Sequence, residues 1–75
     1  MYRLCINKLR TVAAAAGDRT PYAIARSTGI ATSSAYRILS GETQPDLISM
    51  LRISDTYGVP VESLMERTDL AEAIA

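Results

Sequence analysis

Hydrogen-bonding side chains gather between positions 32 and 40 of this sequence. If the segment is a helix, with about 100° between successive residues, one side of it carries Thr32, Ser33, Tyr36, Arg37 and Ser40. That side offers hydroxyl groups, a phenol and a guanidinium but no carboxylate, and the opposite side is mostly apolar. Such a surface can hydrogen-bond to phosphates and to base edges in a major groove. An ordinary solvated helix surface is the alternative, and the helical wheel alone leaves both interpretations open.

The composition gives little support for catalysis. The chain has no histidine, and Cys5 is its single cysteine. The usual zinc sites and the Cys–His and Ser–His nucleophile pairs therefore cannot be assembled. Most carboxylates fall in the C-terminal third, on what the pattern indicates is a solvated helical surface. We expect no catalytic residues, no metal site and no cofactor, so the chain is not expected to be an enzyme.

The formal net charge is zero, but the charges are segregated along the chain. Residues 1–41 carry six basic residues and one acidic residue, a net charge of +5. Residues 42–75 carry two basic and seven acidic residues, a net charge of −5. This asymmetry favours an anionic partner at the basic end. Chance segregation of solvated charges is the alternative.

The length of 75 residues and the 48% of hydrophobic residues are typical of one small folded domain, residues 1–75. No apolar run is long enough to span a membrane, and the N-terminal segment lacks the features of a secretion signal. We therefore expect a cytoplasmic protein with no membrane partner. No binding pocket for a small molecule is evident from the sequence.

Helix signals predict five helices, over residues 8–16, 21–28, 32–39, 45–57 and 60–66. Thr20 followed by Pro21 is typical of a helix start, with a hydroxyl cap and a proline in the first turn. Gly29 and Gly58 are typical of helix ends, because glycine readily adopts the left-handed conformation there. The tail from residue 68 to residue 75 has no clear stop signal.

Apolar residues at spacings of three and four predict which helix faces are buried. In the first helix they are Leu9, Val12, Ala13 and Ala16, and in the fourth they are Leu47, Met50, Ile53 and Tyr57. Between the second and third helices, the predicted core residues are Ile24, Ile30, Ala35 and Ile38.

The N-terminal segment has two interpretations. Tyr2, Leu4 and Ile6 alternate with other residues, which favours a short strand over residues 1–6. Asn7 then fits the N-cap of the first helix. The alternative is a first helix that begins near Arg3. We prefer the strand.

The stretch from residue 20 to residue 41, two short helices joined by a tight turn at Gly29, is typical of a helix-turn-helix. Together with the next four residues, this stretch has the sequence TPYAIARSTGIATSSAYRILSGETQP. It resembles the helix-turn-helix of the Cro and phage-repressor (XRE-type) superfamily of bacterial regulators. The resemblance continues through LISMLRISDTYGVPVESLM, which is similar to the fourth and fifth helices of that family. It implies an all-α fold, a compact five-helix DNA-binding domain like that of lambda repressor, to which the alternation at the N-terminus adds a short strand that could serve in dimer pairing.

The resemblance also implies roles for individual residues. The candidates for DNA base contacts are Thr32, Ser33, Tyr36 and Arg37, with Arg37 the best suited to bidentate contact with guanine. The candidates for contacts with the DNA backbone are Thr20, Tyr22, Arg26, Ser40, Thr43 and Gln44.

Three positions depart from the family pattern. Many relatives have Gln where Pro21 stands, and a proline offers no donor to a phosphate. Many have Ser or Thr where Ala31 stands, which leaves the cap of the third helix open and makes Thr32 a candidate for it. Glu42 lies in a loop that is often basic, and it should lower nonspecific affinity for DNA.

A single helix-turn-helix reads only a few base pairs, so a homodimer is expected, at least on DNA. Two surfaces are candidates for its interface, an N-terminal one with Tyr2, Leu4 and Ile6, and a C-terminal one with Leu70 and Ile74. Packing against the chain's own domain is the alternative for each.

The predicted function is therefore that of a sequence-specific, double-stranded DNA-binding regulator. The resemblance implies a small Cro-like repressor, phage-borne or chromosomal, that occludes a two-fold symmetric operator in a bacterial cell. One alternative is an antitoxin that binds both DNA and a toxin through its acidic C-terminal part. Another is a protein-interaction module that no longer reads DNA.

Overall fold

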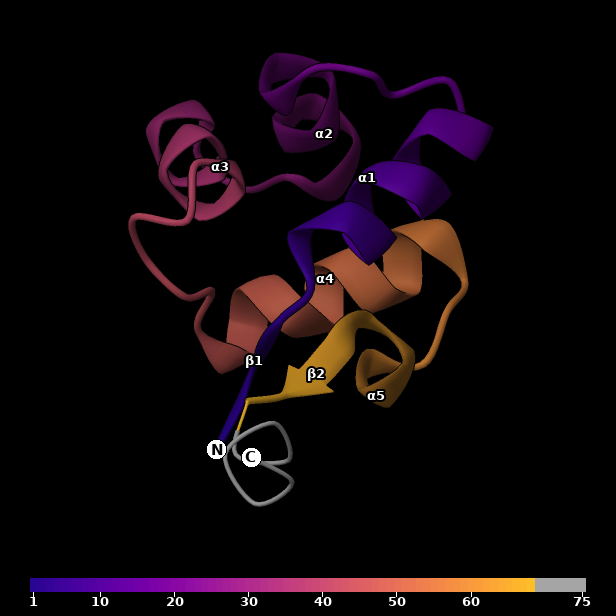
Figure 1. Ribbon diagram of the computed structural model, residues 1–75. Coiled ribbons are helices and arrows are strands. Elements are labelled where there is room, and N and C mark those ends of the chain that lie inside the picture. Colours follow the sequence, from indigo (N-terminus) through magenta and orange to yellow (C-terminus); the bar gives the residue numbers. More distant parts are fainter. Residues whose placement is uncertain (69–75) are drawn as a thin grey trace.

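The computed structural model describes residues 1–68, which form five helices and two short strands (Figure 1). In chain order they are β1 (Tyr2–Leu4), α1 (Ile6–Ala15), α2 (Pro21–Thr28), α3 (Thr32–Leu39), α4 (Leu47–Tyr57), α5 (Val61–Leu64) and β2 (Met65–Arg67). The predicted five-helix fold with a short N-terminal strand is confirmed, and a second strand is added to it. No helix within residues 1–68 is long and apolar enough to cross a membrane.

The two helices α2 and α3 begin and end at the predicted residues, since their signals are local. The Ala23 N–H donates to the Thr20 side chain over 3.1 Å, so Thr20 caps α2 as expected. Gly29 ends α2 with φ +79°, a conformation that favours glycine over residues with a Cβ. The turn between α2 and α3 is therefore specified by the residues inside it.

The start of α1 differs from the prediction. Cys5 is the N-cap residue, and its carbonyl accepts the first helical hydrogen bond, from the Leu9 N–H over 3.1 Å. The predicted cap at Asn7 is wrong, because the strand ends at Leu4 and the helix follows almost at once. The Cys5 N–H donates to the Leu64 carbonyl over 2.8 Å, which fixes this transition against α5.

The start of the fourth helix and both ends of the fifth also differ from the prediction, whereas the fourth helix ends at Tyr57 as predicted. The fourth helix begins at Leu47 with Asp46 as its cap, whose carboxylate accepts from the Ser49 N–H over 2.8 Å, so Pro45 lies outside it. The fifth helix ends at Leu64, and residues predicted to continue it form β2 instead. This segment is extended rather than helical because it pairs with β1, at the other end of the described chain.

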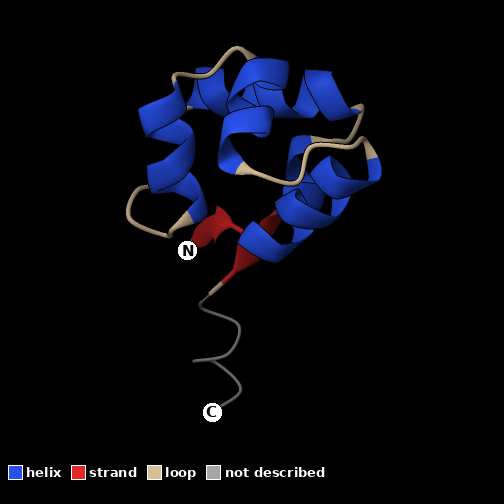
Figure 2. Cartoon of the chain, turned by 90° about the horizontal axis from the view of Figure 1, so that it is seen from above, coloured by secondary structure: helices blue, strands red, loops and turns tan. Residues whose placement is uncertain are grey.

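The strands β1 and β2 form an antiparallel pair that joins the two ends of the described chain, and we call this pair the terminal clasp (Figure 2). Its register places Tyr2 opposite Arg67, Arg3 opposite Glu66 and Leu4 opposite Met65. Across it, Arg3 Nε lies 2.6 Å from Glu66 Oε1. The guanidinium of Arg3 lowers the pKa of the Glu66 carboxyl, chiefly through this hydrogen bond.

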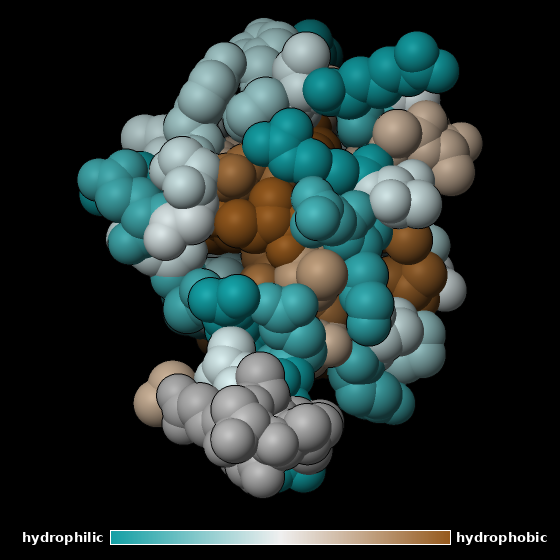
Figure 3. Space-filling model, viewed as in Figure 1, coloured by the Kyte–Doolittle hydropathy of each residue, from teal (hydrophilic) through white to brown (hydrophobic). Residues whose placement is uncertain are grey.

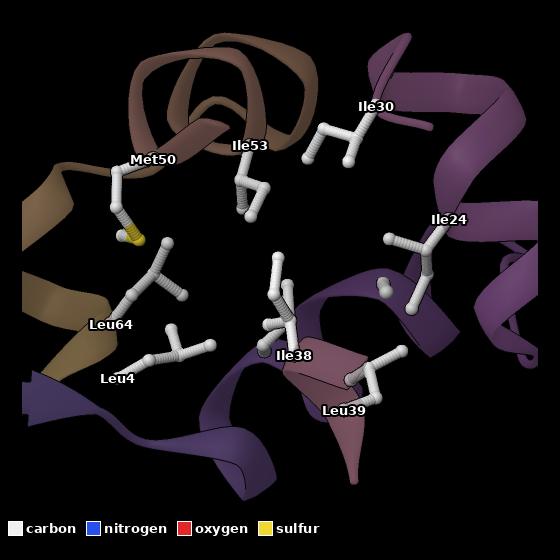
Figure 4. Close-up of a cluster of buried hydrophobic side chains, with 10 residues drawn as sticks. Leu4, Ile24, Ile30, Ile38, Leu39, Met50, Ile53 and Leu64 are labelled. Carbon is white, nitrogen blue, oxygen red and sulfur yellow. The ribbon is translucent and has the colours of Figure 1, made fainter. Parts of the chain in front are cut away.

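The core draws on every helix and on β1 (Figure 4). Leu9, Ile53 and Leu64 are its most completely buried large side chains. In Figure 4, Ile38 lies between Leu4 and Ile24, so the helices α2 and α3 share one core with the terminal clasp. The α2 and α3 residues predicted for this core, together with Ile30 in the turn, are buried.

Two residues predicted for the core are exposed. Ala16 lies just beyond the last residue of α1, past the packed part of that helix, and is exposed. Leu47 is 71% exposed although Met50 and Ile53 of the same predicted stripe are buried, and it is the first residue of α4. The remaining member of the α4 stripe, Tyr57, is partly buried, and its hydroxyl donates to Asp18 over 2.9 Å. Burial and this hydrogen bond raise the pKa of the Tyr57 phenol.

Candidate nucleic-acid interface

The α2 and α3 helices form a closely packed pair. Ala25 and Ala35, one from each helix, are both buried, and their small side chains let helices approach closely. Thr28, at the end of α2, is also buried. Its hydroxyl donates to the Ile24 carbonyl over 2.7 Å and accepts from the Ile30 N–H over 3.4 Å. Because this buried hydroxyl is hydrogen-bonded on both sides of the turn, it helps fix the position of α3 relative to α2.

The exposed side of α3 carries the side chains that the helical wheel placed there, Thr32, Ser33, Tyr36, Arg37 and Ser40. Its other side contributes buried residues to the core. Within α3 the polar face contains no acidic residue. It is therefore an exposed row of hydrogen-bond donors on a helix whose other side packs into the core. The contact of these residues with bases stays a prediction.

The N-terminus of α3 has no side-chain cap. Ala31 stands at the cap position and makes no capping hydrogen bond, and the first turn has no acidic residue. Thr32 is the first residue of the helix rather than its cap. The partial positive charge of this helix end is thus not offset by a carboxylate or a capping oxygen, which suits an anion approaching it.

The predicted backbone-contact residues on α2 lie at its start and along its exposed face. The Thr20 oxygen accepts the capping hydrogen bond, and its hydroxyl hydrogen remains a donor. Tyr22 is half exposed, and the Arg26 guanidinium lies over its ring at 5.9 Å from the centroid. Stacking of this kind holds an arginine near the surface while leaving N–H groups for a phosphate.

Two further basic residues, Arg10 and Arg19, line a hollow between α1, the start of α2 and the end of α3. Arg10 Nη2 donates to the Leu39 carbonyl over 3.4 Å, so its charge is held beside the end of α3. Figure 3 shows apolar side chains at the surface between α3 and α1, surrounded by hydrophilic ones. Both arginines belong to the basic half of the chain, but neither was predicted as a contact. Only Arg19, which directly precedes the cap residue Thr20, had a position in the sequence that could have indicated this.

The loop after α3 is ordered by the carbonyl of Arg37. This oxygen accepts from the backbone N–H groups of Glu42 over 2.9 Å and Thr43 over 3.4 Å, and from the Ser40 hydroxyl over 3.0 Å. The Ser40 hydroxyl hydrogen is thereby used within the chain, which leaves its lone pairs rather than a donor.

Gln44 is shared with the terminal clasp. Its side-chain carbonyl accepts from the Leu4 N–H over 2.9 Å, so only its amide group remains to donate to a phosphate. No sequence pattern indicated this bond, since the two residues are 40 positions apart.

The residues predicted for an N-terminal dimer surface differ in exposure. Tyr2 is exposed, Leu4 is buried in the core, and Ile6 is partly buried in α1. One edge of β1 is paired with β2, and the Leu4 N–H on the other edge is bonded to Gln44. The C-terminal candidates, Leu70 and Ile74, lie outside the described residues.

A different apolar surface is exposed on α4. Three apolar side chains on one side of this helix are at least half exposed: Leu47, Ile48 and Leu51. We call these three residues the α4 outer face. The sequence pattern did not indicate this face, because the spacing of Leu47 assigned it to the core and Ile48 and Leu51 had no predicted role.

Comparison with protein families gives a match to a family model described as helix-turn-helix, over residues 10–64. The match covers α2 and α3 entirely, together with α4 and α5, and begins within α1. Neither the curated proteins nor the solved structures gave a match. The helix α3 has no side-chain cap and no acidic residue and follows a fixed turn, and the match covers most of the chain. The chain therefore belongs to the helix-turn-helix family of the Cro and phage-repressor (XRE) type, a family of DNA-binding transcriptional regulators.

Proposed function

We propose that this protein is a Cro-like repressor that binds as a homodimer to a two-fold symmetric operator and occludes it. The observation that carries the proposal is the exposed face of α3, where hydroxyl groups, a phenol and a guanidinium stand together with no acidic residue among them. A helix with that surface can approach phosphates without charge repulsion and can hydrogen-bond to base edges.

In the proposed complex, α3 lies in the major groove with its first turns toward the bases. Arg37 makes a bidentate contact with guanine O6 and N7, while Thr32 and Ser33 contact bases or a thymine methyl group. Tyr36, half exposed on the same face, contacts a base or a phosphate. These contacts carry the sequence specificity.

The phosphate contacts flank α3 on both sides. On one side stand Thr20, Tyr22 and Arg26, with Arg10 and Arg19 beside them around the hollow. On the other side are Thr43 and the amide group of Gln44, in the loop after α3, together with Ser40, whose hydroxyl exchanges its hydrogen bond to the Arg37 carbonyl for one to a phosphate in the proposed complex. Such contacts fix the orientation of the domain and make its affinity depend on salt.

The proposal is tested by selecting bound sequences from a pool of randomised DNA duplexes. Enrichment of a two-fold symmetric motif, with half-sites about 10 base pairs apart, is the expected result. Enrichment of a single short motif would keep DNA recognition and remove the dimer. No enrichment at low salt would overturn the repressor function and would favour the alternative of a protein-interaction module that no longer reads DNA.

Arg37→Ala tests the role of the recognition helix on the selected duplex. We expect a loss of about 1–3 kcal/mol in binding and a relaxed preference at one base position. Arg67→Ala, which removes the same charge from the terminal clasp, is the matched control and should retain the preference. A uniform loss over unrelated sequences would make Arg37 a phosphate contact instead.

A further inference from the structure

One hydrogen bond joins the terminal clasp to the proposed DNA-binding surface. The Leu4 N–H, on the edge of β1 that does not pair with β2, donates to the Gln44 side-chain oxygen over 2.9 Å. Gln44 is exposed and lies in the loop after α3, where it is proposed to contact a phosphate. The first strand of the chain therefore holds a side chain of the proposed interface, 40 residues away.

This bond determines which end of the Gln44 amide is available. A side-chain amide has an oxygen that accepts and an NH2 group that donates, and a backbone N–H can donate only to the oxygen. With the oxygen held by Leu4, the NH2 group is the end that remains for an anion. A freely rotating glutamine would lose rotamer freedom on binding, and the bond to Leu4 removes part of this cost in advance.

The surroundings of Gln44 suit a phosphate. Gln44 lines a hollow of about 440 Å³ between the terminal clasp, the start of α1 and the loop after α3. Arg3 and Arg10 line the same hollow, and so does Glu66, whose carboxylate lies 2.6 Å from the Arg3 Nε. Two guanidinium groups and one carboxylate give the hollow a net positive charge, so an anion beside the Gln44 NH2 group is attracted rather than repelled.

The position of the Leu4 N–H depends on the closed clasp. On one side of Leu4, the Cys5 N–H donates to the Leu64 carbonyl over 2.8 Å. At the outer end of the clasp, the Thr68 N–H donates to the Met1 carbonyl over 2.9 Å. If these strands separated, the segment that carries the Leu4 N–H would be released, and the Gln44 side chain with it.

We propose that the terminal clasp is a positioning element for DNA binding: the closed clasp holds the Gln44 oxygen and thereby directs the Gln44 NH2 group to a backbone phosphate. The inference rests on the proposed function, which supplies the DNA. With the clasp open, Gln44 is not oriented and the protein binds DNA more weakly. Because such a coupling acts in both directions, bound DNA also stabilises the closed clasp.

Two substitutions of Glu66 that change the charge equally test the proposal. Bonded pairs alternate along an antiparallel ladder, so Glu66 and Arg3 form the bonded pair between the two end pairs. Glu66→Pro removes the N–H from this pair and should open the clasp, whereas Glu66→Gln keeps the N–H and is the control.

Affinity for the selected duplex is the measurement. Glu66→Gln should bind at least as tightly as the wild-type protein, because it removes a negative charge. Glu66→Pro should bind about three- to tenfold more weakly than Glu66→Gln, because Gln44 is no longer held. A thermal melt establishes that both variants are folded at the temperature of the titration. Equal affinities of the two folded variants would overturn the proposal.

Gln44→Ala shows whether the clasp acts through this side chain. In the Gln44→Ala background, Glu66→Pro and Glu66→Gln should bind the duplex equally tightly, since the group that the clasp positions is gone. An undiminished difference between them would overturn the role of Gln44 and leave the clasp a purely structural part of the fold.

Hydrogen exchange in the wild-type protein provides a readout that needs no variant. Bound DNA should slow the exchange of the Leu4 amide hydrogen by about three- to tenfold, a factor similar to the loss in affinity. Slower exchange in α3 without a change at Leu4 would overturn the proposal. No binding of any duplex by the wild-type protein would instead overturn the proposed function itself, and the same titrations reveal this separately.

Discussion

The helices α3 and α4 both bury one side in the same core, but their exposed sides differ in chemistry. The exposed side of α3 is polar and free of acidic residues, whereas the exposed side of α4 begins with Leu47, Ile48 and Leu51. A polar surface next to phosphates fits recognition of DNA, and an apolar surface next to it fits contact with protein. The two consecutive helices therefore present exposed sides of different chemistry, one suited to DNA and the other to a protein.

The largest expected effect separates the two sides of α4. Ile53→Ala should lower the free energy of unfolding by about 2–5 kcal/mol, because Ile53 is 1% exposed and its loss leaves a cavity. Leu51→Ala, two residues earlier on the exposed side, should change it by about 0.5 kcal/mol or less. Denaturation with urea measures both. A comparable loss for Leu51→Ala would mean that the α4 outer face is covered within the monomer.

A carboxylate on α3 should weaken DNA binding without weakening the fold. Ser33→Asp places a negative charge on the face proposed to approach phosphates, so affinity should fall about tenfold or more. Stability should be retained or slightly raised, since an acidic residue in the first turn of a helix interacts favourably with its dipole. Titration of a labelled duplex and a thermal melt measure the two effects.

Ser63→Asp adds the same charge to an exposed position of α5 and is the matched control. It should bind DNA nearly as well as the wild-type protein. Equal losses for Ser33→Asp and Ser63→Asp would show that net charge, rather than the α3 surface, determines the affinity.

The smallest expected effect is on stability. It depends on the cap of α4, because Asp46 caps that helix whereas α3 has no side-chain cap. Asp46 caps α4, and its hydrogen bonds to Ser49 lower its folded-state pKa. A lowered pKa contributes stability above the unfolded-state pKa, and this contribution is lost as the pH falls through the folded-state value. We therefore expect the advantage of the wild-type protein over Asp46→Asn to begin to decline below about pH 3.9, the ordinary pKa of an aspartate, and to be lost once the pH falls below the lowered folded-state pKa.

Melting temperatures of the two proteins across this range provide the measurement. Asparagine is also a good capping residue, so the variant should fold. A difference that persists unchanged into acid would assign the effect to something other than the ionised cap.

The parts of the fold that could be predicted from the sequence are those specified by nearby residues. Thr20 and Pro21 start α2 and Gly29 ends it, and each of these signals acts within four residues of its own position. The exposed side of α3 was predicted for a similar reason, since its two sides differ in polarity.

The rest depends on contacts that no local pattern contains. The strand β2 is extended because it pairs with β1, more than sixty residues earlier. The hydrogen bond between the Leu4 N–H and the Gln44 side chain likewise joins β1 to a residue 40 positions away. On α4, apolar residues occur on both sides, so spacing alone could not distinguish Leu47 from the buried Met50. The residues predicted for the site are exposed, and their contacts with DNA stay predictions. Arg10, which the fold brings to the start of α2, was not among them.

The terminal clasp has a consequence for the order of folding. The family match ends at residue 64, before β2, and begins after β1, so the clasp lies outside the shared helix-turn-helix unit. Closing it brings together residues at opposite ends of the chain, which is the costliest loop closure in this fold. The helices α2, α3 and α4 can assemble from contacts between near neighbours, and we expect the clasp to close after them. Amide hydrogens of β1 should accordingly exchange with solvent sooner than those of α2 and α3, so that the ends of the chain can open while the recognition helix stays folded.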